Sequence, residues 1–327
     1  MSTPRRARHD PVSAKGKREA VPVWEAVAPR ARLGVDIAFR GGAQLIGRDE
    51  ELTALRDAVG RSARGGNAQL VTLIGEPGIG KSRLIYELWA ELEADPDLYV
   101  FWRQGRSLPY GDGVSFWALG EMTKAHAGIL ESDDSQAAEE KLRDAVGQAV
   151  ADPAEAAWVE SHLRPLVGLG SEQGGDDSRT ETFAAWRRFF ESLAEQRPLV
   201  LVFEDLHWAD EGLLDFIDHL VEWAADSPLL VVCTARPELL ERRLDWGGGK
   251  RNAATISLSP LGEKDTARLL EALAGDANRE IVSRSGGNPL YAEEYARNPY
   301  AYFTCPLARR GEGICANQPP LSGVGGE

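Results

Sequence analysis

The sequence is poor in cysteine and in long apolar runs, and these two scarcities exclude several classes of protein. Of its three cysteines, Cys233 sits inside an apolar run, whereas Cys305 and Cys315 have neither a second cysteine pair nor a histidine nearby. This spacing excludes a common structural zinc site and fits a reducing compartment such as the cytoplasm. No apolar run approaches the roughly 18 residues of a membrane span, and the basic N-terminus lacks the apolar centre of a secretory signal.

Positive charge is also scarce. The chain has 37 Lys and Arg against 51 Asp and Glu, which gives a formal net charge of −14. A general nucleic-acid binder needs basic side chains to neutralise phosphates. The composition therefore disfavours nucleic acid as a partner, although a local basic face would escape this count. We expect no membrane partner either, and a cytoplasmic protein.

Short apolar runs that alternate with helical patterns are what the sequence does contain. Hydrophobic residues make up 43% of the 327 residues, which is enough for a large core. The expected strands are "QLVTLIG" (69–75), "LYVFWRQG" (98–105), "LVLVFE" (199–204), "LLVVCTAR" (229–236) and "ATISLSPL" (254–261). Because strands and helices alternate, we predict an α/β fold with a parallel sheet.

Pattern changes along the chain predict four regions. Residues 1–40 are expected to form a flexible leader with one short extended piece, "AVPVWEA". Residues 41–258 hold the α/β pattern, and residues 259–296 continue as helices of a smaller unit. From residue 297 the periodicity ends, so we expect a disordered tail over 297–327.

One motif carries specific chemistry. "GEPGIGKS" matches G-x-x-x-x-G-K-[ST] without deviation, follows an expected strand and opens an expected helix. Glycines let backbone N–H groups turn towards phosphate oxygens, and the helix N-terminus adds partial positive charge. Lys81 is expected to reach the β and γ phosphates of ATP, and the Ser82 hydroxyl to bind Mg²⁺. The candidate phosphate-binding residues are Gly75, Glu76, Pro77, Gly78, Ile79, Gly80, Lys81, Ser82 and Arg83.

Two acids end a later strand, "LVLVFEDLHWAD". Ligands of such sheets bind at the carboxyl ends of the strands, so Glu204 and Asp205 should face the metal and the γ-phosphate. We predict that Glu204 lies on the metal side through a water and Asp205 near the γ-phosphate, where it orients the attacking water. Side chains alternate along a strand, so both acids reach one site only if the strand ends between them. The alternative for Asp205 is that it caps a loop N–H.

The residues after these acids suggest structural roles. Asp210 is expected to be the N-cap of the next helix. His207 and Trp208 are expected to pack or anchor the loop rather than take part in catalysis.

The motifs together resemble the STAND class of P-loop ATPases in the AAA/ORC-like group. The resemblance is carried by "LIGRDEEL" (45–52), "LIGEPGIGKSRL" (73–84), "LVLVFEDLHWAD" (199–210), "LLVVCTARPELL" (229–240), "LSPLGEKDTARLL" (258–270) and "GGNPLYAEE" (286–294). It implies a three-layer P-loop NTPase core with five parallel strands and a small helical lid. It also implies that ATP lies between core and lid, and that the ATP or ADP state switches a larger signalling protein.

The resemblance implies further binding residues. Ile46, Gly47 and Arg48 should lie near the adenine or ribose, and Thr234 and Arg236 should sense the γ-phosphate. In the lid, Gly287, Asn288 and Pro289 match a G-x-P element, with Pro289 on the adenine side. The alternatives are a surface salt bridge for Arg236 and an ordinary helix-ending turn for the G-x-P element.

A narrower resemblance concerns "AKGKREAVPVWEAV" (14–27), which looks like the closing segment of class III adenylate/guanylate cyclase domains. This short segment lacks a metal-binding aspartate pair, so we expect no cyclase activity. The irregular tail suggests a truncated or frame-shifted product.

The function predicted from these residues is an ATP-binding, Mg²⁺-dependent and slowly hydrolysing regulatory ATPase module. Its partners would be ATP, ADP and an unknown protein, or absent cyclase and helical-repeat domains. One alternative is a nucleotide-dependent protein-interaction platform that does not hydrolyse ATP. A DNA-loading protein would need a basic winged helix after the lid, and none is visible in the sequence. The third alternative is a non-functional remnant.

Overall fold

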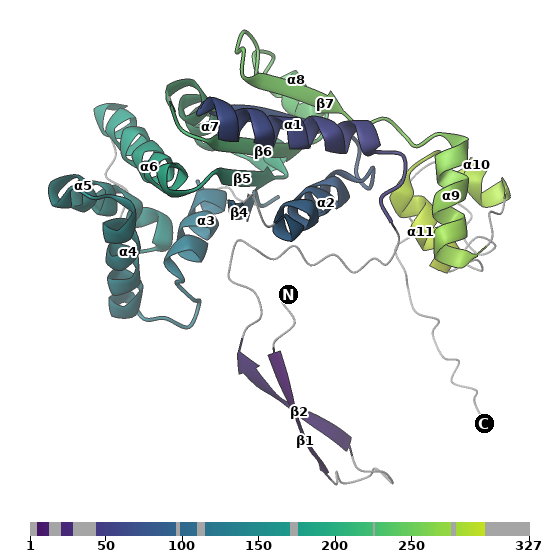
Figure 1. Cartoon of the computed structure of the whole chain (residues 1–327), viewed down its shortest axis with the longest axis horizontal. Coiled ribbons are helices and arrows are strands. Elements are labelled where there is room, and N and C mark those ends of the chain that lie inside the picture. Colours follow the sequence, from purple (N-terminus) through teal and green to yellow (C-terminus); the bar gives the residue numbers. More distant parts are fainter. Residues whose placement is uncertain are drawn as a thin grey trace, which may run out of the picture. The chain divides into compact units, whose positions relative to one another are not determined.

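The computed structural model describes residues 5–12, 21–28, 44–95, 99–109, 115–170, 176–224, 226–275 and 279–297 (Figure 1). The chain divides into two compact units. The first is drawn from residues 1–41 and 48–259, and the second from residues 42–47 and 260–327. The predicted tail over 297–327 lies outside the described residues apart from Arg297.

A five-stranded parallel sheet forms the centre of the first unit, which confirms the predicted fold class. Its strand order is β4-β5-β6-β3-β7. The strands are β3 (Gln69–Ile74), β4 (Phe101–Arg106), β5 (Leu199–Glu204), β6 (Leu229–Ala235) and β7 (Ala253–Ser257). Every residue of β5 and β6 is buried, because helices cover both faces of the sheet. This explains their unbroken apolar runs.

Helices α1 (Asp49–Gly65) and α2 (Lys81–Ala94) flank the strand that leads into the glycine-rich loop. Helix α1 contacts β3, β6 and α2. It ends at Gly66, whose φ of 64° is the left-handed conformation that glycine adopts without strain. Helix α7 (Glu211–Trp223) begins as predicted, because the carboxylate of Asp210 accepts a 2.8 Å hydrogen bond from the N–H of Leu213.

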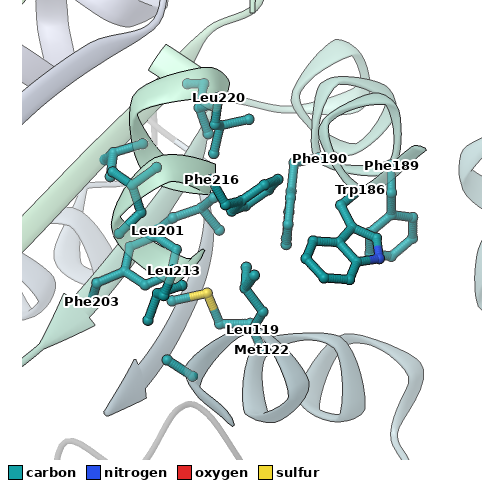
Figure 2. Close-up of a cluster of buried hydrophobic side chains, with 14 of the residues drawn as sticks. Leu119, Met122, Trp186, Phe189, Phe190, Leu201, Phe203, Leu213, Phe216 and Leu220 are labelled. Atoms are coloured by element: carbon teal, nitrogen blue, oxygen red, sulfur yellow. The ribbon is translucent and has the colours of Figure 1, made fainter. Parts of the chain in front are cut away.

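An aromatic-rich core joins the sheet to a group of helices at the β4 side (Figures 1 and 2). The helices are α3 (Trp117–Ala127), α4 (Ser135–Ala149), α5 (Pro153–Leu163) and α6 (Asp176–Gln196), with a 3₁₀ turn η1 (Pro165–Val167). Figure 2 shows side chains from α3, α6, α7 and β5 that meet in this core: Leu119, Met122, Trp186, Phe189, Phe190, Leu201, Phe203, Leu213, Phe216 and Leu220. This packing fixes β5, and with it the two acids at its end.

Close packing of β4 on α3 makes Gly105 sensitive to substitution. A Cβ at Gly105 would lie 2.2 Å from the carbonyl oxygen of Ala118, and backbone cannot move aside cheaply. We expect Gly105→Ala to lower the free energy of unfolding by about 2 kcal/mol or more, measured by urea denaturation. Gly147→Ala in α4 is the matched control, since a Cβ there meets nothing within 4 Å. It should be neutral or stabilising by up to about 1 kcal/mol, and equal stability of the two variants would contradict this packing.

The second unit is a small helical bundle. It contains α9 (Glu263–Ala274), α10 (Arg279–Ser285) and α11 (Pro289–Arg297). Its buried apolar residues are Ile46, Leu261, Leu269, Leu270 and Ala292. Gly287 needs to be glycine, because its φ is 75° and a Cβ would lie 2.3 Å from the carbonyl oxygen of Leu261. Pro289 is the first residue of α11, where its missing N–H costs no hydrogen bond.

The leader contains a two-stranded antiparallel sheet. The predicted extended piece falls in β2 (Val21–Ala28), which pairs with β1 (Arg5–Val12). The sequence did not predict β1. Among the described residues, no helix is long and apolar enough to cross a membrane.

Candidate nucleotide-binding site

The glycine-rich loop connects β3 to α2, as its motif predicted. Gly78 and Gly80 have φ values of 78° and 108°, which only glycine adopts readily. Gly80 is also the N-cap of α2, and no side chain caps that helix. The backbone N–H groups of the first turn are therefore left for another acceptor, which is the arrangement that binds phosphate.

Contacts from distant segments hold this loop in place. The N–H of Gly75 donates to the carbonyl oxygen of Ala235 at 3.2 Å, and Ile79 is buried. The buried guanidinium of Arg48 donates to the carbonyl oxygens of Ile79 at 3.3 Å and Ser259 at 2.5 Å. Arg48 therefore braces the loop. Its predicted place near the adenine or ribose stays a prediction.

Lys81 lies at the mouth of the loop. Its Nζ donates to the carbonyl oxygens of Gly75 at 2.6 Å and Glu76 at 3.0 Å. Burial lowers the pKa of Lys81, Asp205 opposes this shift, and the positive charge of Arg236 adds to it. The structure thus brings together Lys81, Asp205 and Arg236, which the sequence placed in one site.

Strand β5 ends between the two acids. Glu204 is the last strand residue, whereas Asp205 has left-handed backbone angles (φ 58°, ψ 40°). The N–H of Asp205 donates to Oγ1 of the buried Thr234 at 3.1 Å. No hydrogen bond from a loop N–H to the Asp205 carboxylate occurs among the described residues. The strand end is the condition under which both acids can serve one site.

Arg106 is a site residue that sequence reasoning missed. It ends β4 in register with Glu204, and its guanidinium contacts Glu204 Oε2 at 2.8 Å and Asp205 Oδ2 at 3.5 Å. Burial opposes the charge of Arg106, but the Glu204 carboxylate outweighs it and raises the pKa of Arg106. The sequence signal was a basic residue directly after the expected strand 98–105.

Replacement of Arg106 should show how much the ion pair with Glu204 contributes to stability. The Glu204 side chain is 5% exposed, so Arg106→Ala leaves a buried carboxylate without its cation. We expect a loss of about 1–3 kcal/mol of unfolding free energy, measured by thermal or urea unfolding. The control is Arg56→Ala, which removes an exposed pair with Glu91 and should cost about 0.5 kcal/mol or less. Equal losses in the two variants would mean that water replaces Arg106 at Glu204.

Arg236 stacks on Trp208. Its Cζ lies 5.7 Å from the centre of the Trp208 ring, and it forms no ion pair with any described residue, which argues against the surface salt bridge. Trp208 belongs to the 3₁₀ turn η2 (Leu206–Trp208) that follows Asp205. The carbonyl oxygen of His207 accepts from Arg242 of α8 (Glu238–Arg242) at 3.3 Å.

The remaining predicted residues are distributed between the units. Ser82 is exposed in the first turn of α2, and Nε of Arg83 donates to Glu87 at 2.8 Å. Ile46, Gly47 and Pro289 belong to the second unit. In the ranges that the structure describes, no three His, Cys, Asp or Glu side chains form a metal-binding group. A hydroxyl (Ser82) and carboxylates (Glu204 and Asp205) are the oxygen donors that Mg²⁺ takes, since this ion keeps several waters and binds substrate phosphates.

Comparison with known families decides the class. The family described as "AAA ATPase domain" matches residues 44–232, more than half of the chain. The chain belongs to this family. It is therefore a nucleotide-binding ATPase module, consistent with its P-loop and sheet.

Among curated proteins, an uncharacterized protein of Rhizobium meliloti (strain 1021) is 28% identical over 285 residues. That match covers 83% of this chain and 27% of the relative. This chain thus spans about a quarter of the length of that relative.

Several solved structures are similar to this chain at low identity. Cdc6p from Pyrobaculum aerophilum is 14% identical, with a TM-score of 0.47 over 81% of this chain and 64% of that one. The Aeropyrum pernix ORC1 protein in complex with DNA is 14% identical, with a TM-score of 0.48 over 83% and 62%. A STAND protein with a tetratricopeptide repeat sensor from Pyrococcus horikoshii is 14% identical, with a TM-score of 0.39 over 77% and 29%.

Proposed function

We propose that the chain binds ATP with Mg²⁺, hydrolyses it slowly and acts as the regulatory ATPase module of a signalling protein. One observation carries this proposal. The N-terminus of α2 at the glycine-rich loop has no side-chain cap, the Lys81 amine contacts that loop, and the charge of Asp205 acts on Lys81. This arrangement supports a phosphate chain at the loop with an acid at its far end.

The roles of individual residues follow from their places. Backbone N–H groups of residues 75–83 and the Lys81 amine hold the phosphates, and Ser82 with Glu204 holds the Mg²⁺ shell. Asp205 orients the attacking water, since its carboxylate has the largest electrostatic effect of any acid on Lys81. Thr234 and Arg236 sense the γ-phosphate. Ile46, Gly47, Arg48 and Pro289 contribute to the base and ribose.

The regulatory role rests on the larger context. The family match, and a relative about four times as long as the matched segment, support a module within a multidomain regulator. We infer a cytoplasmic signalling protein, with a cyclase or helical-repeat domains as its other parts. The charge of −14 continues to disfavour a general nucleic-acid role.

The test is ATP binding by the purified chain with Mg²⁺, followed by phosphate release in the same samples. Binding with slow release is the expected result. An absence of binding at millimolar ATP would overturn the proposal.

Binding without release would favour the second candidate, a nucleotide-dependent interaction platform. One observation favours that candidate: Arg106 pairs with Oε2 of Glu204, the carboxylate that is assigned to the metal shell. Arg106→Ala would then restore release, whereas a slow hydrolase would gain little from this variant.

A further inference from the structure

A cavity of about 390 Å³ lies beside η2 in the first unit. It is formed by the segment after β4, the start of α3, η2 and α8. The lining residues that carry the argument are Ser107, Phe116, Trp117, His207, Trp208 and Arg242. Small-molecule sites usually measure about 300–1,000 Å³, so this cavity has room for one small ligand.

Aromatic rings form its walls. Trp117 and Trp208 are 40% and 44% exposed, which is unusual for tryptophan. Phe116 has a φ of 63°, a conformation that a bulky residue adopts only at a cost. Strained residues of this kind concentrate at ligand sites, and exposed flat rings favour a planar apolar molecule.

Two polar side chains of the lining have no partner. The Ser107 side chain is buried, and its Oγ makes no hydrogen bond with the described part of the chain. The same holds for both ring nitrogens of His207. A neutral imidazole ring offers one hydrogen-bond donor and one acceptor. Buried polar groups are usually paired, and rotation towards a ligand would pair these.

The charged side chains of the lining, Arg242 and Asp210, already have partners within the protein. Arg242 donates to the carbonyl oxygens of His207 and Ala209, and its Nε lies 3.2 Å from Glu211. Asp210 caps α7. A charged ligand would find no counter-ion among these two residues, so an uncharged ligand fits the cavity better.

We propose that this cavity binds a small, uncharged heteroaromatic molecule with one hydrogen-bond donor and one acceptor, held by Ser107 and His207 between tryptophan rings. Occupancy of the cavity is coupled to the nucleotide site through Trp208, because the guanidinium of Arg236 lies over the Trp208 ring. The binding step is independent of the proposed function, whereas the coupling step rests on it.

The first experiment titrates benzimidazole into the full chain by calorimetry. Benzimidazole has one N–H donor and one acceptor nitrogen, whereas indole has the same shape without the acceptor. We expect benzimidazole to bind, indole to bind at least about fivefold more weakly, and Ser107→Ala and His207→Phe each to weaken benzimidazole about tenfold. Trp223→Phe, at an exposed tryptophan outside the cavity, is the control and should bind as the unmodified chain does.

Three results would overturn the binding step. These are no binding at millimolar benzimidazole, equal affinity for indole, or affinity unchanged by both cavity substitutions. Lys81→Ala should bind benzimidazole normally, because Lys81 does not line the cavity. Benzimidazole binding by a chain that fails to bind ATP would therefore refute only the proposed function.

The second experiment measures the coupling. Saturating benzimidazole should change the Kd for ATP by about fivefold or more, and ATP should change the Kd for benzimidazole by the same factor. Arg236→Gln should keep benzimidazole binding and lose this mutual effect. An unchanged ATP affinity in the presence of benzimidazole, or coupling that survives Arg236→Gln, would overturn the route through Trp208.

Discussion

Replacement of Lys81 by alanine should reduce ATP affinity by about 100-fold or more. The amine is buried, lies between the carbonyl oxygens of Gly75 and Glu76, and is the basic side chain that the loop places at its own mouth. A phosphate chain in that loop would lose its main counter-ion, and charge-assisted contacts of this kind are the strong ones. Fluorescent ATP analogues with Mg²⁺ would measure the change.

Folding must be separated from binding in this test. The pKa of Lys81 is lowered by its burial, so the charged amine costs free energy in the absence of an anion. We therefore expect the variant without nucleotide to be as stable as the original chain, while ATP no longer raises its melting temperature. Lys141→Ala, which removes a surface pair with Asp133, is the matched control and should keep ATP binding. Normal ATP affinity in Lys81→Ala would refute the P-loop interpretation.

The sheet and the loop could be predicted because their signals are local. Each apolar run predicts its own strand, and the G-x-x-x-x-G-K-S motif predicts its own loop, without information from distant segments. Asp210 is predictable for the same reason, since an N-cap needs only the N–H three residues on. Each of these features is fixed by backbone geometry that a short segment determines alone.

The contacts that complete the site could not be predicted, because they depend on register between distant strands. Arg106 reaches Glu204 only because β4 lies beside β5 with these residues opposite each other. The stacking of Arg236 on Trp208 likewise needs the neighbouring position of β5 and β6. The order of the strands along the chain does not reveal which strands are neighbours in the sheet. Strand β3, for example, lies beside β7, which is far from it in sequence.

Strand β1 escaped prediction for a different reason. "RRARHDPV" lacks the apolar alternation that predicts a strand. It is a strand because it pairs with β2, and this pairing cannot be read from its own residues. For Glu204 and Asp205, the sequence predicted that both acids reach one site only if the strand ends between them. The left-handed angles of Asp205 meet that condition.

Replacement of Asp205 by asparagine should leave ATP binding intact and reduce phosphate release by about 100-fold or more. Asparagine has the shape of aspartate and tolerates the left-handed backbone angles at this position, so the turn and the bond to Thr234 should survive. The variant loses the charge that would accept a proton from the attacking water, and with it the 3.5 Å ion pair to Arg106. Single-turnover phosphate release, normalised to bound ATP, separates this loss from any change in affinity.

The matched variant is Glu204→Gln, which tests the other acid. Glu204 is held by Arg106 and is the acid assigned to the Mg²⁺ shell, so its loss should weaken the dependence of binding on Mg²⁺. A titration of ATP affinity against Mg²⁺ would measure this. If release falls only in Glu204→Gln and persists in Asp205→Asn, the roles of the two acids are reversed. That outcome would assign the proton of the attacking water to Glu204 Oε1, because Arg106 pairs with Oε2 and leaves the other oxygen available.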